Sequence, residues 1–139
     1  QVALATVELS ERIATADWGD LGGGALRLRI PTKCPTMTAA CLDNPSNYQW
    51  DQYRLSGGTL WLHTDTGAGC GGGRVIARNV LFTVSFNGTG NAIDYAVLWD
   101  NGLAGSRHRT HEFRGHVASR LRAAPGGSLA PAPGLPPVC

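Results

Sequence analysis

Apolar and polar residues follow two different periods along the chain. In the first segment, QVALATVELSERIATADW, the apolar residues fall three and four positions apart: Val2, Ala5, Leu9, Ile13 and Ala16. This spacing is typical of one face of an α-helix, so residues 1–18 are predicted to be helical. The pattern starts without an N-cap, and we expect it to be the end of a longer helix. Gly22-Gly23-Gly24 is predicted to end the helix, because glycine holds helical backbone angles poorly.

Beyond the glycines the period changes to two. Residues 25–31 alternate Leu26, Leu28 and Ile30 with Arg27 and Arg29. This alternation predicts a strand with one buried face, from which the two arginines point away.

Five further stretches are also predicted to be strands. Residues 48–55 and 59–64 flank Ser56-Gly57-Gly58 and are predicted to form a hairpin, because a Gly-Gly turn supplies the positive φ that strand twist requires. Two prolines, two cysteines and an Asn-Pro make residues 33–48 a loop, and NGTGN (87–91) a turn. The remaining predicted strands are 74–86, 92–99 and 110–121. For the last of these, a short helix near its end remains an alternative.

One helix followed by about six strands predicts an α+β fold. In this fold the N-terminal helix packs on an antiparallel β-sheet of about 4–6 strands. Residues 1–122 are expected to form the globular domain. Residues 123–139 are a Pro/Gly-rich tail without periodicity, tied back to the domain by Cys139.

Length and charge narrow the function classes. A chain of 139 residues suits one domain. A formal net charge of +2 is too small to indicate a nucleic-acid-binding protein by itself. No apolar run reaches the roughly 18 residues of a membrane span, and no signal peptide is visible. A chain that looks secreted ordinarily carries one or the other, so we expect a segment to be missing upstream.

The four cysteines, Cys34, Cys41, Cys70 and Cys139, contain no Cys-x-x-Cys pair. This spacing favours two disulfides in an oxidising compartment over a zinc or redox site. Three pairings are possible. We favour Cys34–Cys41, which closes a short loop, and this choice leaves Cys70 to pair with Cys139.

The stretch HTDTGAGCGGGR contains Asp65-Thr66-Gly67, the tripeptide of aspartic proteases. His63 and Thr64 precede it, where such proteases carry apolar residues that raise the pKa of one carboxylate. Asp-Thr-Gly is also an ordinary turn sequence. We keep a protease only as a remote alternative and expect no catalytic residue.

The glycines of the same stretch are not predicted to bind phosphate. A phosphate loop precedes a helix N-terminus, whereas RVIARNV follows here and reads as a strand. The stretch is therefore predicted to be a linking loop between strands.

The sequence HRTHEFRGH offers His108, His111, Glu112 and His116 as metal ligands. On a strand, His108, Glu112 and His116 stand too far apart to share one ion. We expect no metal site and no cofactor.

Basic residues concentrate near the C-terminal end. Residues 103–122 contain five arginines and three histidines against the single acid Glu112. The arginines suit either a subunit contact or DNA phosphates, although Phe113 alone provides no stacking platform. These candidate contact residues are Arg107, Arg109, Arg114, Arg120 and Arg122.

Three segments in this order resemble the soluble domain of type IV pilin-like proteins, in particular minor pilins and pseudopilins. They are YRLSGGTLWLHT (53–64), GGGRVIARNVLFTVSF (71–86) and IDYAVLW (93–99). The resemblance spans residues 1–122. It implies that residues 1–18 are the C-terminal half of the long pilin helix, whose apolar N-terminal half lies upstream.

The resemblance also implies a function. The chain is expected to be a structural subunit of a bacterial type IV pilus, a DNA-uptake (competence) pilus or a type II secretion pseudopilus. Its partners would be other pilin or pseudopilin subunits, with the upstream half-helix anchored in the inner membrane before assembly into a periplasmic or cell-surface filament. No small-molecule substrate is expected. The alternative is a pilus-tip module that binds DNA through residues 107–122.

Overall fold

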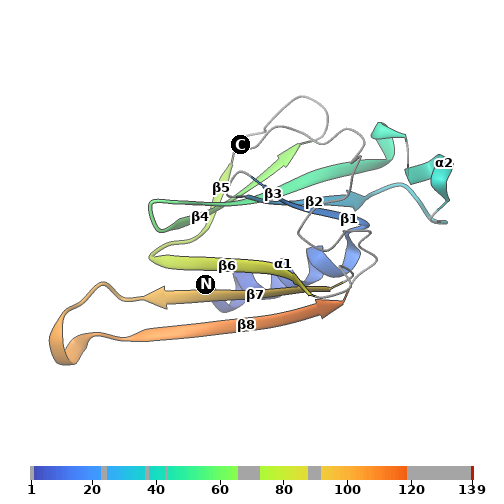
Figure 1. The fold of residues 1–139 in the computed structure, drawn as a ribbon. Helices are drawn as coiled ribbons and strands as arrows, with labels where there is room; N and C mark the ends of the chain where they lie inside the picture. Colours follow the sequence, from blue (N-terminus) through green and yellow to red (C-terminus); the bar gives the residue numbers. More distant parts are fainter. Residues whose placement is uncertain are drawn as a thin grey trace.

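The computed structural model describes residues 2–22, 25–36, 38–42, 44–65, 73–87, 92–118 and 139. Within them the helix α1 (Val2–Thr15) precedes a series of strands (Figure 1). The strands are β1 (Trp18–Gly22), β2 (Ala25–Pro31), β3 (Tyr48–Ser56), β4 (Thr59–Asp65), β5 (Arg74–Ala77), β6 (Val80–Asn87), β7 (Ala92–Asp100) and β8 (Thr110–Ala118).

The strands form two antiparallel sheets rather than one. The large sheet has the order β1-β2-β3-β4-β5, and the small sheet has the order β6-β7-β8. The predicted α+β fold with a single sheet of about 4–6 strands is therefore wrong. The described residues form a mainly-β fold with one long helix.

The second sheet arises at one interruption that the alternation did not predict. Residues 74–86 were expected to be one strand, but β5 ends at Ala77 and β6 begins at Val80. Between them Asn79 takes a left-handed conformation, with φ at 57°. The Asn79 carbonyl accepts a hydrogen bond from the Asp100 amide at 2.9 Å. Asparagine tolerates this conformation better than most residues, so the chain leaves the large sheet here and enters the small one.

The first helix is shorter than predicted. It ends at Thr15, and Trp18 begins a strand that pairs with β2 instead of continuing the helix to residue 18. The Trp18 ring packs on the guanidinium of Arg29, 4.7 Å from the ring centroid. Tertiary contacts thus end the helix several residues before the glycines that were expected to do so.

The hairpin prediction is confirmed. β3 and β4 pair from Ser56–Thr59 to Trp50–Asp65, and both turn glycines have positive φ, 58° at Gly57 and 76° at Gly58. These values suit a tight two-residue turn that matches strand twist. Strands are also present at residues 92–100 and 110–118, as the alternation predicted; residues 119–121 of the last prediction lie outside the described residues.

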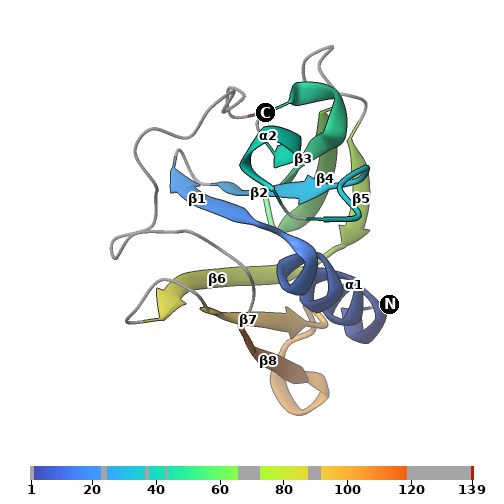
Figure 2. The ribbon, with the colours of Figure 1, turned by 90° about the vertical axis from the view of Figure 1, so that its right-hand side faces the viewer.

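Helix α1 lies between the two sheets and contacts β2, β5, β7 and β8 (Figure 2). The predicted apolar stripe is the buried face: Ala5, Leu9, Ile13 and Ala16 are buried, and Val2 packs against the same core. They join the core residues of both sheets, including Leu26, Tyr53, Ile93 and Val97. One helix face therefore supplies apolar contacts to two sheets at once.

Strand β2 is buried on both faces, which corrects the expectation that Arg27 and Arg29 face solvent. Arg27 is 9% and Arg29 0% exposed. Arg27 pairs with Asp20, and Arg29 Nε donates to Asp17 Oδ1 at 2.9 Å. The predicted alternation of a strand was right. The sequence alone did not reveal that one carboxylate from β1 and one from the residue directly before it would be buried together with these arginines.

The predicted loop 33–48 contains a short helix, α2 (Ala39–Leu42), and a 3-10 turn at Pro45–Asn47. Cys34 and Cys41 form a disulfide here, the pairing that the short loop favoured. None of the helices in the described part of the chain has the length and apolar character needed to cross a bilayer.

Candidate interaction surfaces

Polar contacts fix α1 to the large sheet. Arg12 Nε donates to Asp51 Oδ2 at 2.8 Å, and Arg12 Nη1 lies 3.4 Å from the Tyr53 hydroxyl. Asp51 is 1% exposed, and its Oδ1 accepts from Gln49 and Thr64 at 2.9 and 3.0 Å. The carboxylate is therefore fully hydrogen-bonded, which satisfies the requirement for a buried charge.

This contact perturbs two ionisable groups. Burial opposes the charge on Arg12, but the interactions with Tyr53 and Asp51 together outweigh it and raise the pKa of the guanidinium. Burial, opposed by the nearby Arg12, raises the pKa of Tyr53 to about 12. Tyr53 is therefore a neutral hydroxyl in the fold at ordinary pH.

A tyrosine fixes α1 to the small sheet. The Tyr95 hydroxyl lies 2.6 Å from Ser10 Oγ and donates to the Thr6 carbonyl at 3.2 Å. The Tyr95 ring reaches the helix by lying across Gly115 on β8, where an added methyl group would overlap the ring. Gly115 thus has a defined role: its missing side chain leaves room for the bond between the sheet and the helix.

The opposite face of α1 is exposed and contains two large apolar side chains, Leu4 and Val7. Its exposed residues include one charge, Glu11, and are otherwise Ala3, Leu4, Val7, Ala14 and Thr15. Leu4 is 63% and Val7 54% exposed. Two large apolar side chains exposed as neighbours on one helix face give it the character of a surface that another molecule covers.

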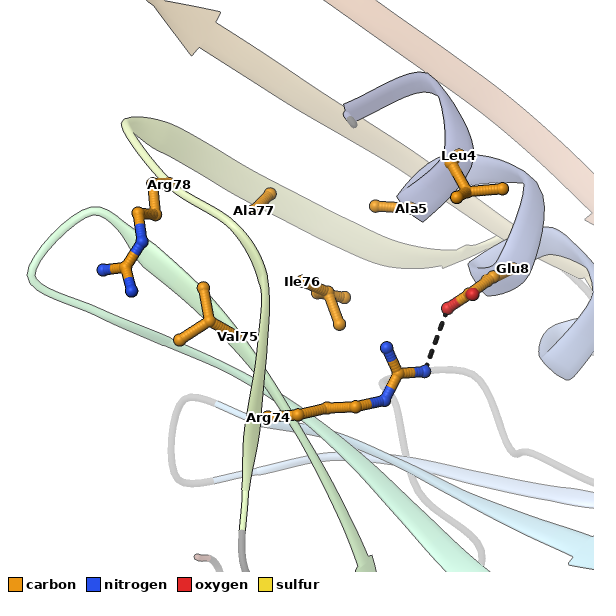
Figure 3. A pocket seen from close by; sticks show the side chains of 8 residues that line it. All are labelled: Leu4, Ala5, Glu8, Arg74, Val75, Ile76, Ala77 and Arg78. Atoms are coloured by element: carbon orange, nitrogen blue, oxygen red, sulfur yellow. Dashed lines mark hydrogen bonds and ion pairs between the residues drawn. The ribbon is translucent and has the colours of Figure 1, made fainter.

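A groove of about 380 Å³ runs between α1 and β5 (Figure 3). Leu4, Ala5 and Ile76 supply apolar lining, and Arg74 Nη2 donates to Glu8 Oε2 across it at 3.1 Å. Figure 3 shows Arg78 pointing away from the helix. The ion pair closes the groove on one side and leaves no free carboxylate in it.

The β7–β8 hairpin projects beyond the rest of the molecule (Figure 1). Its connecting residues, 101–109, are held by the side chain of Asn101. Asn101 Nδ2 donates to the Arg107 carbonyl at 2.8 Å, and Oδ1 accepts from the amides of Leu103 and Arg109, both at 3.1 Å. Sequence reasoning missed this loop, although Asp100-Asn101-Gly102 is a turn signal.

The candidate metal ligands are held in separate contacts rather than grouped around a metal position, and the His111 ring packs against the Phe113 ring at 4.6 Å between centroids. His108 Nε2 lies 3.0 Å from Asp100 Oδ2, His116 pairs with Asp94, and Glu112 pairs with Arg114. The described residues contain no group of three or more His, Cys, Asp or Glu side chains arranged to hold a metal.

The arginine-rich segment divides between described and undescribed residues. Arg107, Arg109 and Arg114 are exposed, and Arg109 Nη1 donates to the carbonyls of Ser106 and His108 at 2.8 Å. The candidate contact residues Arg120 and Arg122 lie outside the described residues. Of these three described arginines, Arg114 pairs with a carboxylate, that of Glu112, whereas Arg109 bonds to backbone carbonyls and keeps its charge uncompensated.

Asp65 is the last residue of β4 and is 7% exposed. Thr66, Gly67 and the rest of the glycine-rich stretch to Gly72 lie outside the described residues, so the structure shows no geometry for the protease alternative. β5 follows the stretch and pairs antiparallel with β4. The prediction that the stretch is followed by a strand, and not by a helix that would bind phosphate, is confirmed.

The C-terminal cysteine meets a buried polar side chain. Cys139 is disulfide-bonded, and its amide donates to Gln52 Oε1 at 3.1 Å. Gln52 is 0% exposed in the middle of the large sheet. The predicted partner, Cys70, lies outside the described residues, as does the tail 123–138.

No family model, curated protein or solved structure matches this chain in comparisons made with all three.

Proposed function

We propose that the chain is a structural subunit, a minor pilin or pseudopilin, of a bacterial type IV pilus, a DNA-uptake (competence) pilus or a type II secretion pseudopilus. In this proposal a segment upstream of Gln1 continues α1 as an apolar half-helix. That half-helix anchors the subunit in the inner membrane before the subunit enters a periplasmic or cell-surface filament.

The observation that carries the proposal is that α1 has large apolar side chains on two opposite faces. One face packs between the sheets through Leu9 and Ile13, while the other leaves Leu4 and Val7 exposed. In a filament a neighbouring subunit would cover the second face. The proposal does not depend on the single-sheet architecture, which is wrong for this chain.

The residues encoded upstream provide one test. The proposal predicts a short basic leader ending in glycine, followed by about 20 apolar residues. A conventional cleaved signal peptide directly before Gln1 would refute it.

The second test removes the exposed apolar face without touching the core. Leu4→Gln combined with Val7→Gln should leave the unfolding midpoint of the purified chain nearly unchanged. The same pair should lower the amount of the chain in sheared filaments about tenfold or more, because burying each side chain contributes about 1.5–3 kcal/mol. Leu81→Gln is the matched control, since Leu81 is 59% exposed on the outer face of the small sheet. Equal incorporation of all variants would contradict the proposal.

A second candidate function is DNA binding at a pilus tip. The observation that favours it is the exposure of Arg107 and Arg109 on the projecting hairpin. Filter binding titrated against salt tests it, because phosphate neutralisation weakens steeply as salt rises. A flat response at low salt would remove DNA binding.

A further inference from the structure

We propose that the tip of the β7–β8 hairpin docks onto the exposed face of α1 on a second copy of this chain. The tip is residues 101–109, and the receiving surface is the stripe formed by Leu4, Val7 and Glu11. This inference rests on the proposed function as a filament subunit and names the contact between neighbouring copies.

The tip is already ordered for binding before any partner arrives. Besides the three bonds of Asn101, Asp100 Oδ1 accepts from the Gly102 amide at 2.7 Å, and the His108 amide donates to the Gly105 carbonyl at 3.1 Å. A loop held in one conformation loses little entropy on association. The tip is therefore suited to recognition.

The tip presents one exposed apolar and one exposed cationic side chain. Leu103 is 52% exposed, and Arg107 is exposed without an ion-pair partner among the described residues. The backbones of both residues bond to the same Asn101 side chain, which holds the two positions on one ordered loop. A matching surface must offer an apolar contact next to a carboxylate.

The α1 stripe offers this combination. Leu4, Val7 and Glu11 follow spacings of three and four, so they lie along one face of the helix. Glu11 is exposed and has no ion-pair partner in the part of the chain that the structure describes, whereas seven other carboxylates there contact an arginine or a histidine. Glu11 is thus a carboxylate available to a cation from outside.

The two surfaces do not meet within one molecule, because Leu103 and Leu4 are both more than half exposed in it. They are also different patches of the chain, so the contact between copies is heterologous. A heterologous contact that does not close into a ring generates an open helical array. An open array of this kind is the arrangement that a filament subunit requires.

Photo-crosslinking tests the contact directly. The purified chain with a benzophenone amino acid in place of Leu103 is irradiated at high concentration, and the adducts are mapped by peptide mass spectrometry. The expected adduct joins the tip to residues 2–15 of another molecule. The same probe at Leu81 is the control and should give no such adduct. Adducts elsewhere, or none at the highest soluble concentration, would overturn the docking.

Charge reversal tests the pairing. Glu11→Arg and Arg107→Glu should each lower the yield of the adduct about fivefold, while the double variant should restore it. Failure of the double variant to recover would exclude the Glu11–Arg107 pair. A tip that retains DNA but gives no adduct would overturn the docking in favour of the nucleic-acid candidate.

The outcomes separate this inference from the proposed function. Filaments that contain the chain, without a contact between residue 103 and α1, would leave the function standing and reject the docking. A chain that forms the adduct in solution but is absent from filaments would support the docking and reject the proposed function.

Discussion

The two sheets contain similar ion pairs in opposite surroundings. On the large sheet, Arg29 of β2 and its partner Asp17, which directly precedes β1, are 0% and 3% exposed. In the small sheet, the side chains of Arg114 and its partner Glu112 are 76% and 38% exposed. Because solvent screens the second pair and not the first, the same chemistry has very different consequences for stability. The comparison teaches that the burial of an ion pair, and not its mere presence, decides how much the pair contributes to the free energy of unfolding.

The largest effect is expected from Arg29→Ala. It leaves Asp17 buried without its cation, and removing one partner of a buried pair costs about 3–5 kcal/mol. Arg114→Ala is the matched control and should cost less than about 1 kcal/mol. Urea unfolding of both variants measures the loss in the free energy of unfolding. Equal losses would contradict the claim that the buried pair and the exposed pair differ in their contribution to stability.

Replacing both partners sharpens this result. Arg29→Met with Asp17→Leu removes the charges together, so most of the loss in Arg29→Ala should be recovered. A double variant as unstable as Arg29→Ala would assign the loss to packing between Trp18 and Tyr48, whose rings each lie 4.7 Å from the Arg29 guanidinium.

A smaller effect is expected at Tyr53 in alkaline solution. Its pKa is raised to about 12 in the fold, above the value near 10 of an unfolded tyrosine. The unfolded chain therefore loses this proton first, and the free energy of unfolding should fall by roughly 2–3 kcal/mol as pH rises from about 10 to 12. Tyr53→Phe should lack this part of the decline. Parallel curves for the two proteins in urea titrations across that range would contradict the expectation.

The smallest effect is expected at Asp100 on the exposed hairpin. The hydrogen bond from His108, helped by that from the Gly102 amide, lowers the pKa of this carboxyl. A lowered pKa contributes stability above the unfolded value near 3.9, and the contribution is lost as pH falls through the folded pKa. The stability difference between the native chain and Asp100→Asn should therefore vanish in acid.

Carboxyl NMR signals measure this effect directly. The midpoint for Asp100 should lie below that of an ordinary aspartate, and His108→Ala should raise it. A midpoint that His108→Ala leaves unchanged would show that the histidine does not cause the shift.

Local sequence determined the features that depend on an apolar stripe, a turn or a short loop. The stripe of Leu9 and Ile13 identified α1 and its buried face, and Gly57-Gly58 identified the hairpin because its φ values suit glycine. The short separation of Cys34 and Cys41 indicated their disulfide. Each of these features depends on residues close together in the chain.

Tertiary structure decided what depends on distant partners. Arg27 and Arg29 look like solvent-facing residues until Asp20 and Asp17 pair with them, since a charge enters the interior only with a partner. The break at Asn79 is likewise visible only once Asp100 bonds to its carbonyl. The placement of the Leu103 and Arg107 backbones in one ordered tip follows from the Asn101 contacts, which no spacing rule along the chain predicts. Periodicity indicates which face of an element is apolar. The number of sheets, and whether each charged side chain is buried or exposed, depend on contacts between residues far apart in sequence.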